Sequence, residues 1–117
     1  HYFLMSIFRN LIINAIDSIE NRGHIIFSHI KEGSNHKFIV EDNGSGIKEE
    51  DLPYIFSPGY SSKINYSTGE INRGLGLPLV ENIIRNYLEG SIRVESEYGI
   101  GTKFIITIPK DELESEH

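Results

Sequence analysis

The sequence predicts a single α/β domain in which two or three helices cover one face of a sheet. Its 117 residues are enough for one hydrophobic core. Apolar residues recur with helical spacing near the start of the chain and again over 75–88. Short segments bounded by turn residues lie between and after these two stretches, as strands do. We find no internal repeat and no linker, so residues 1–117 are interpreted as one domain.

The first helix is indicated by its apolar periodicity, and Gly23 is expected to cap its end. Two strands are expected next, His24 to Lys31 and Lys37 to Glu41, around a turn at 32–35. The apolar residues of the helix that share the period are Leu4, Ile7, Phe8, Leu11, Ile12, Ala15, Ile16 and Ile19.

The second half of the chain predicts a short helix, a long loop, a longer helix and a strand pair. The short helix is expected over Lys48 to Phe56, and the longer one over Leu75 to Leu88. Residues 57–73 are polar and without periodicity, which predicts a mobile, functional loop. The strands are expected at Ser91 to Ser96 and Thr102 to Ile108.

Composition excludes several classes of function. The chain has no Cys, so disulfides and thiolate metal sites are ruled out. Its net charge of −6 argues against nucleic-acid binding, which depends on phosphate contacts. No apolar run approaches the roughly 18 residues of a membrane-spanning helix, and no signal peptide is visible. Because the chain starts inside a predicted helix, we expect it to be a fragment of a longer protein.

Two asparagines stand out in the first helix. Asn10 and Asn14 are four residues apart, so a helix stacks them on one face, with Asp17 a turn further along. Asn is a poor helix former. The stripe is either a solvated face or a set of amide oxygens pointing into a ligand site. Amide oxygens suit Mg²⁺, which keeps waters and phosphates as its other ligands.

Two glycine-containing segments also have two interpretations. EDNGSGI (41–47) is either a plain turn or a place where Asp42 accepts a hydrogen bond from a base amine, with Gly44 and Gly46 beside the ring. NRGLGLPLV (72–80) is either a flexible loop-to-helix junction or an anion site at a helix start. It is neither a P-loop nor a dinucleotide-binding fingerprint.

Two further segments are weak signals by themselves. IFSPGYSSK (55–63) ends in Lys63, which is either solvated or able to reach phosphates. GIGTKF (99–104) is read almost equally well as a hairpin turn entering a strand.

In this order, the segments resemble the ATP-binding catalytic domain of sensor histidine kinases. This family is related to type II topoisomerases, heat-shock-90 chaperones and mismatch-repair ATPases. RNLIINAID resembles the N box, DNGSGI the G1 box, IFSPGYSSK the F box, RGLGL the G2 box and GTKF the last glycine-threonine box. The resemblance implies an α/β (α+β) two-layer sandwich, with a mixed, mostly antiparallel sheet covered on one face by helices (the Bergerat fold).

The resemblance also implies ATP and Mg²⁺ as ligands. Asn14 would ligate Mg²⁺, and Asn10 would face the phosphates. Asp42 would bind the adenine amine, supported by Thr102 through a water. The implied nucleotide-binding positions are Asn10, Asn14, Asp17, Asp42, Gly44, Gly46, Ile47, Lys63, Arg73, Gly74, Leu75, Gly76, Leu77 and Thr102.

Position 10 distinguishes branches of the wider family. In ATP-hydrolysing relatives a Glu one turn before the metal-binding Asn activates water, and Asn10 cannot act as a base. The resemblance therefore favours phosphoryl transfer to a histidine on a separate helical dimerisation domain, upstream of a response regulator. Asp17 departs from the family, because many members carry Lys or Arg there. This puts more demand on Lys63 and Arg73 for phosphate charge.

None of the five histidines looks like a phosphoacceptor, and those near the predicted strands are expected to be structural or surface residues. We therefore expect a domain that faces the cytoplasm, is monomeric in isolation and does not phosphorylate itself. Three alternatives are kept: a serine kinase of the anti-sigma-factor type, a non-catalytic ATP-binding module, and an ATPase, which Asn10 disfavours.

Overall fold

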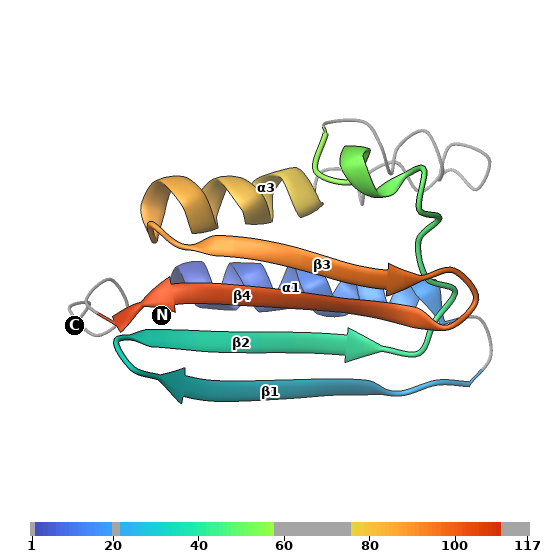
Figure 1. The fold of residues 1–117 in the computed structure, drawn as a ribbon, viewed down its shortest axis with the longest axis horizontal. Coiled ribbons are helices and arrows are strands. Elements are labelled where there is room, and N and C mark those ends of the chain that lie inside the picture. Colours follow the sequence, from blue (N-terminus) through green and yellow to red (C-terminus); the bar gives the residue numbers. More distant parts are fainter. Residues whose placement is uncertain (1, 20–21, 58–75, 111–117) are drawn as a thin grey trace.

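The computed structural model describes residues 2–19, 22–57 and 76–110, and these form a sheet with helices on one side (Figure 1). The elements in chain order are α1 (Tyr2–Ser18), β1 (Ile25–Glu32), β2 (Asn35–Asp42), the single 3-10 turn η1 (Leu52–Tyr54), α3 (Gly76–Asn82), the π-helical turn η4 (Ile83–Tyr87), β3 (Ser91–Glu97) and β4 (Gly101–Pro109). In this part of the chain no helix is long and apolar enough to cross a bilayer.

The sheet has the strand order β1-β2-β4-β3, and each neighbouring pair of described strands is antiparallel. The prediction of a mostly antiparallel sheet with helices on one face is confirmed. The register places Asp42, the last residue of β2, directly opposite Thr102 near the start of β4. Two residues that are 60 positions apart in the sequence therefore face each other at one end of the sheet.

The core lies between this sheet and the helices. Alternate residues of β2 and β4 point toward α1 and α3, because successive side chains in a strand point to opposite faces. Phe38 and Val40 come from β2, and Phe104, Ile106 and Ile108 from β4. The helices contribute Ile7, Leu11, Leu77, Val80, Ile83 and Ile84.

The helix α1 carries apolar residues on two sides, which its periodicity did not separate. Ile7, Leu11 and Ala15 are buried against the sheet. Ile12 and Ile16, which the same apolar pattern includes, are 36% and 56% exposed. The shared helical period therefore does not distinguish buried from exposed residues, because Ile12 and Ile16 lie more than a quarter-turn around the helix from the line Ile7, Leu11 and Ala15.

The helix also ends earlier than predicted. Regular α-helix stops at Ser18, and Gly23 does not adopt the left-handed backbone of a glycine cap. A side chain at Gly23 would instead collide with Ile19 and with Asn43 Oδ1, which would lie 2.7 and 2.6 Å from its Cβ. Gly23 is therefore required by close packing against the residue after β2, not by a helix cap.

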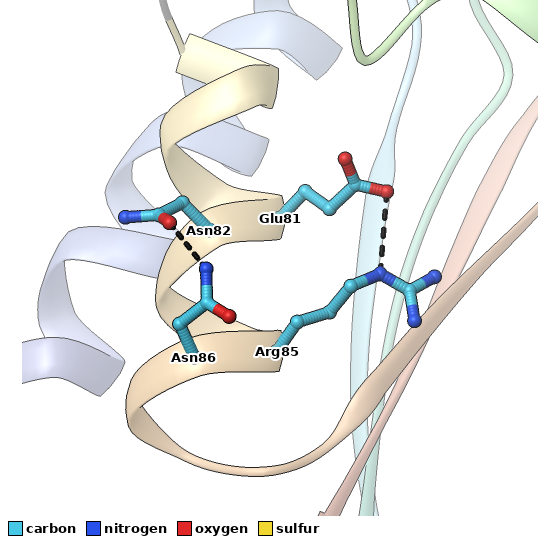
Figure 2. A network of polar contacts seen from close by, with 4 residues as sticks. All are labelled: Glu81, Asn82, Arg85 and Asn86. Atoms are coloured by element: carbon cyan, nitrogen blue, oxygen red, sulfur yellow. Dashed lines mark hydrogen bonds and ion pairs between the residues drawn. The ribbon is translucent and has the colours of Figure 1, made fainter.

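The prediction for 75–88 is right in type for the described part, but the helix changes its winding. The α3 helix ends at Asn82 and continues as the π-helical turn η4. Figure 2 shows two exposed side-chain pairs along this helix: Arg85 Nε lies 3.3 Å from Glu81, and Asn86 Nδ2 donates to Asn82 Oδ1 at 2.6 Å. Exposed i,i+4 pairs of this kind contribute only about 0.3–0.5 kcal/mol each.

The short helix expected over 48–56 is only the turn η1, since Pro53 removes one backbone donor within it. The histidines of β1 and β2 pair with each other: His29 Nε2 lies 2.9 Å from His36 Nδ1, and the His29 ring stacks on Phe38. His36 is buried. The expectation that they are structural or surface residues is confirmed.

Candidate functional site

A small cavity opens between α1, the start of α3 and the end of the sheet where Asp42 faces Thr102. Its volume is about 120 Å³. That is below the roughly 300–1,000 Å³ of whole-ligand pockets, so the cavity has room for a flat ring but not for an entire nucleotide. The lining residues are Asn14, Ala15, Ser18, Asp42, Gly46, Ile47, Leu77, Thr102 and Phe104.

Asp42 is a buried carboxylate with one side held and the other directed to the cavity. It is 7% exposed. Its Oδ1 accepts a hydrogen bond from the backbone N–H of Gly44 at 2.8 Å. The Ser18 hydroxyl lies 3.1 Å from the same oxygen and shares its single proton between Asp42 and the Ala15 carbonyl, which is 2.9 Å away. No described residue donates to Oδ2. Because Asp42 lines the cavity, Oδ2 is available to accept a proton donor from a ligand bound there.

Thr102 is oriented by a serine on the neighbouring strand. Ser96 Oγ lies 2.9 Å from Thr102 Oγ1, donates to the carbonyl of Gly101 at 2.9 Å and accepts the N–H of Ile47 at 2.8 Å. A hydroxyl has a single proton to donate, and Ser96 gives it to Gly101. Thr102 is then the donor to Ser96, which leaves the Thr102 lone pairs as acceptors at the cavity.

Asn14 carries a polar atom that the described structure leaves unsatisfied. Its amide nitrogen Nδ2 is buried and has no hydrogen-bond partner. Such an atom costs about 1–3 kcal/mol when nothing binds it. The nitrogen and oxygen of the amide exchange places by a half-turn, so either can face the cavity. Because Asn14 lines the cavity, its amide lies where a bound ligand could contact it.

The loop after β2 passes so close to its neighbours that side chains are excluded. A Cβ on Gly44 would meet Ser18 Oγ at 2.1 Å, and one on Gly46 would meet the carbonyl of Glu97 at 2.3 Å. Gly46 also has a φ of +75°. The loop is further held by the hydrogen bond from Ser45 N to the Ser18 carbonyl at 2.8 Å. This close packing fixes the wall of the cavity beside Asp42.

Asn10 lies one turn before Asn14 and borders a second, larger cavity. Its Nδ2 donates to the Ser6 carbonyl at 2.8 Å, and its Oδ1 faces the start of α3. A Cβ added to Gly76 would lie 3.1 Å from that oxygen. This cavity has a volume of about 580 Å³ and lies between α1 and α3. Asn14 therefore lines the smaller cavity, and Asn10, one turn earlier on the same side of α1, lines the larger one.

The fold brings together some of the sequence-predicted residues and not others. Asn14, Asp42, Gly46, Ile47, Leu77 and Thr102 all line the smaller cavity. Asp17 is exposed and is not among its lining residues. The positions Lys63, Arg73, Gly74 and Leu75 lie outside the described residues.

Sequence reasoning missed two serines. Ser18 donates to Asp42, and Ser96 orients Thr102 and Ile47. Ser18 had a signal, because it lies one helical turn after Asn14 on nearly the same side of α1. Ser96 had none, since its role depends on the pairing of β3 with β4.

A two-layer sandwich with a buried carboxylate, close-packed glycines and an unsatisfied amide in one cavity defines a ligand-binding domain of the nucleotide-binding kind. Comparison with known proteins agrees. Residues 2–112 match the family described as histidine kinase-, DNA gyrase B-, and HSP90-like ATPase. Sporulation kinase C of Bacillus subtilis is 34% identical over 91% of this chain and 23% of its own length. The sensor histidine kinase DcuS of Escherichia coli is 40% identical over 92% and 19%.

Solved structures give the same answer. The nucleotide-free catalytic domain of histidine kinase ThkA superposes with a TM-score of 0.78 at 30% identity, covering 93% of this chain and 67% of that one. The chain belongs to the histidine kinase-, DNA gyrase B-, and HSP90-like ATPase family, and within it to the ATP-binding catalytic domains of sensor histidine kinases. It spans about a fifth of the length of the curated relatives it matches.

Proposed function

We propose that this domain binds Mg-ATP and donates the γ-phosphoryl group to a histidine on a separate helical dimerisation domain, in two-component signalling. One observation carries the proposal: the unsatisfied amide of Asn14 and the buried carboxylate of Asp42 line the same cavity. A carboxylate acceptor fits the exocyclic amine of adenine. An amide oxygen donor fits a hard cation such as Mg²⁺.

Some residues around the adenine ring would contact it, and others would hold those residues in position. Asp42 accepts the adenine amine at Oδ2, while Ser18 and Gly44 hold Oδ1 in place. Thr102 offers an acceptor beside it. The glycine-containing wall leaves space for a flat ring against the backbone. The cavity volume of about 120 Å³ suits the base alone, and the phosphates extend toward Asn10.

The amides of α1 suit the metal and the phosphates. Asn14 would hold Mg²⁺, and Asn10 would face the phosphates one turn away. The bound cation supplies positive charge that neutralises phosphate oxygens. A single amide ligand is enough for Mg²⁺ when waters and phosphates complete its shell.

The amide at position 10 favours phosphoryl transfer to a histidine over ATP hydrolysis. An amide cannot take a proton from water near pH 7, so the site lacks a base for hydrolysis at this position. Transfer needs none from the domain: an imidazole nitrogen of the acceptor forms the new N–P bond as the bond from γ-phosphorus to the bridging oxygen breaks. ADP leaves with that oxygen. The catalytic contribution is then positioning and charge stabilisation.

The parent protein and its partners are part of the same proposal. The acceptor histidine belongs to the helical dimerisation domain, and a response regulator takes the phosphoryl group from it. The domain works in the cytoplasm, where ATP is available, and the isolated chain is monomeric. One named relative is a sensor histidine kinase and the other a sporulation kinase, which supports this class of partner. The serine-kinase alternative predicts a different phosphorylated residue.

Calorimetric titration of Mg-ATP tests the binding half. The unmodified chain should bind in the micromolar range. Asp42→Ala should weaken binding about tenfold or more, because a hydrogen bond to a charged group is lost. Asn14→Ala should bind ATP with little dependence on Mg²⁺. Asn82→Ala is the matched control: it removes an exposed helix amide that bonds only Asn86 and should change nothing. No binding by the unmodified chain contradicts the proposal.

The transfer half is tested by adding a helical phosphoacceptor domain and labelled ATP. A phosphohistidine is lost in acid and kept in base, whereas a phosphoserine survives acid. Label that disappears on acid treatment supports the histidine kinase. Acid-stable label supports the serine kinase, and ATP binding without label supports the non-catalytic module.

A further inference from the structure

A further pocket lies beside the smaller cavity, where the loop after β2 meets the turn between β3 and β4. Its volume is about 400 Å³, within the roughly 300–1,000 Å³ of small-molecule pockets. Arg22, Asn43, Ser45 and Tyr98 line it, and Ser18 lines both this pocket and the smaller cavity. We call it the side pocket.

Backbone hydrogen bonds hold the wall of the side pocket. The N–H of Ser45 donates to the Ser18 carbonyl at 2.8 Å, and the N–H of Gly99 donates to the Ser45 carbonyl at 2.6 Å. The loop and the turn are therefore tied to the end of α1 by the protein itself. A pocket that is formed in advance loses less conformational entropy when a ligand binds.

The polar side chains that remain available in the side pocket are donors suited to an anion. Arg22 is the one charged residue among those that line it. Within residues 2–19, 22–57 and 76–110, the Arg22 guanidinium makes no ion pair. Asn43 Oδ1 accepts the N–H of His24 at 2.7 Å, and no described residue accepts from Asn43 Nδ2. A planar guanidinium binds a carboxylate through two parallel hydrogen bonds.

An aromatic ring adds a flat apolar surface to this pocket. The side chain of Tyr98 is 62% exposed, and Lys48 Nζ lies 5.4 Å from the centroid of its ring. Aromatic rings stack on one another in offset arrangements. Arg22 and Lys48 also place positive charge near the ring, in a chain whose net charge is −6. The side pocket therefore offers a cation and a stacking surface together.

We propose that the side pocket binds a small aromatic carboxylate and that this ligand weakens the binding of Mg-ATP. The carboxylate lies against Arg22 and Asn43, and the ring stacks on Tyr98. The effect on Mg-ATP rests on the proposed function, whereas the binding of the carboxylate does not.

Ser18 connects the side pocket to the base site. Its single hydroxyl proton is shared between Asp42 Oδ1 at 3.1 Å and the Ala15 carbonyl at 2.9 Å. A carboxylate in the side pocket offers this proton a third acceptor. Oδ1 is then held by the Gly44 N–H alone, so Asp42 is less firmly oriented toward the adenine amine. By linkage, each ligand lowers the affinity of the other by the same factor.

NMR titration with benzoate tests the site. The backbone amide signals of Ser45 and Gly99 report on the side pocket, and those of Leu77 and Phe104 report on the smaller cavity. We expect benzoate to bind in the millimolar range and to shift the first pair. Benzamide has the same shape without the charge, so it should bind about tenfold more weakly.

Two pairs of variants separate charge from stacking. Arg22→Gln should lower benzoate affinity about tenfold, because a charge-assisted hydrogen bond is lost. Arg93→Gln is its control, since Arg93 is an exposed arginine on β3. Tyr98→Ala should lower the affinity several-fold, and Tyr54→Ala should leave it unchanged. Tyr54 is 61% exposed, which matches Tyr98, but does not line the side pocket.

Calorimetric titration of Mg-ATP at increasing benzoate concentrations tests the connection. We expect the Mg-ATP affinity to fall about fivefold and then to level off once the side pocket is saturated. In Ser18→Ala the same comparison should show a much smaller change, although benzoate still shifts Ser45 and Gly99. Competition for one site would instead lower the affinity without levelling off.

Other results overturn the proposal. Shifts centred on Leu77 and Phe104, or an Mg-ATP affinity that keeps falling with benzoate, would place benzoate in the smaller cavity. Equal affinity for benzoate and benzamide, or no loss in Arg22→Gln, would refute the anion site. Benzoate in the side pocket without any change in Mg-ATP affinity would refute the connection through Ser18. A chain that fails to bind Mg-ATP in the absence of benzoate contradicts the proposed function, and the NMR result still decides whether the side pocket binds a carboxylate.

Discussion

The residue at position 10 is expected to determine whether ATP is hydrolysed or its phosphoryl group is transferred. Its amide is held by the Ser6 carbonyl and faces the start of α3. A carboxylate there would be a base beside the phosphates, whereas the amide is not. The side chain differs from Glu by one methylene and one ionisable group, so a short series of variants can separate geometry from basicity.

We predict that Asn10→Glu gives measurable ATP hydrolysis. General-base catalysis contributes on the order of 10²–10⁴-fold, so a rise of at least tenfold over the unmodified chain is expected. Asn10→Gln is the control, because it has the length of Glu without the base. The measurement is phosphate release at saturating Mg-ATP. Equal rates for Glu and Gln would show that position 10 does not select between transfer and hydrolysis.

The candidate site was only partly predictable from its residues. Asn10, Asn14 and Asp42 were identifiable because their types are unusual for their positions: amides inside an apolar helix and a carboxylate at a strand end. Ser96 was not identifiable, because an alternating strand contains many such serines. Its role comes from hydrogen bonds to Thr102 and Ile47, which only the pairing of distant segments creates.

At the scale of elements, neighbouring apolar residues of α1 lie in different environments. Leu11 is fully buried, and its neighbour Ile12 is 36% exposed. The sequence presents both as apolar residues of the same periodic pattern. The hydrophobic contribution depends on the area removed from water, so the two side chains should differ strongly in their effect on stability.

We predict that Leu11→Ala lowers the free energy of unfolding by about 2–5 kcal/mol, as expected for a core truncation that leaves a cavity. Ile12→Ala should cost less than about 1 kcal/mol, because its side chain is already partly hydrated. Urea unfolding followed by circular dichroism measures both. Equal losses would mean that the outward side of α1 is packed in the folded protein.

The strands were predicted to within about two residues, and the helices less well. Alternation and turn residues are local signals, and they place β1 to β4 correctly. Where a helix ends depends on what packs against it. No local sequence pattern indicated the π-helical turn Ile83–Tyr87 or the end of α1 at Ser18.

At the scale of the whole molecule, ligand binding and folding are linked. The cavity is built from α1, the loop after β2, α3 and β4, so it exists only when all of them are assembled. A ligand that binds this assembly and not the unfolded chain must stabilise the fold.

We predict that Mg-ATP at a hundred times its dissociation constant adds about 2.7 kcal/mol to the free energy of unfolding. For a domain of this size the melting temperature should rise by several degrees. Chelating the metal with EDTA at the same ATP concentration should reduce the rise. Thermal melts of the unmodified chain and of Asp42→Ala give the comparison, and a rise in Asp42→Ala as large as in the unmodified chain would contradict the assigned base site.

The sequence by itself determined the class of fold, the segments that surround the ligand and the residue types suited to Mg-ATP. The fold class follows from the periodicity of apolar residues. The ligand-lining segments follow from polar side chains whose burial is unfavourable unless a ligand binds them. Only the tertiary structure decided which apolar residues of α1 are buried in the core and which are exposed. It alone decided that Ser18 and Ser96 hold Asp42 and Thr102 in place. The physical reason is that burial and hydrogen-bond partners depend on contacts between segments far apart in the chain.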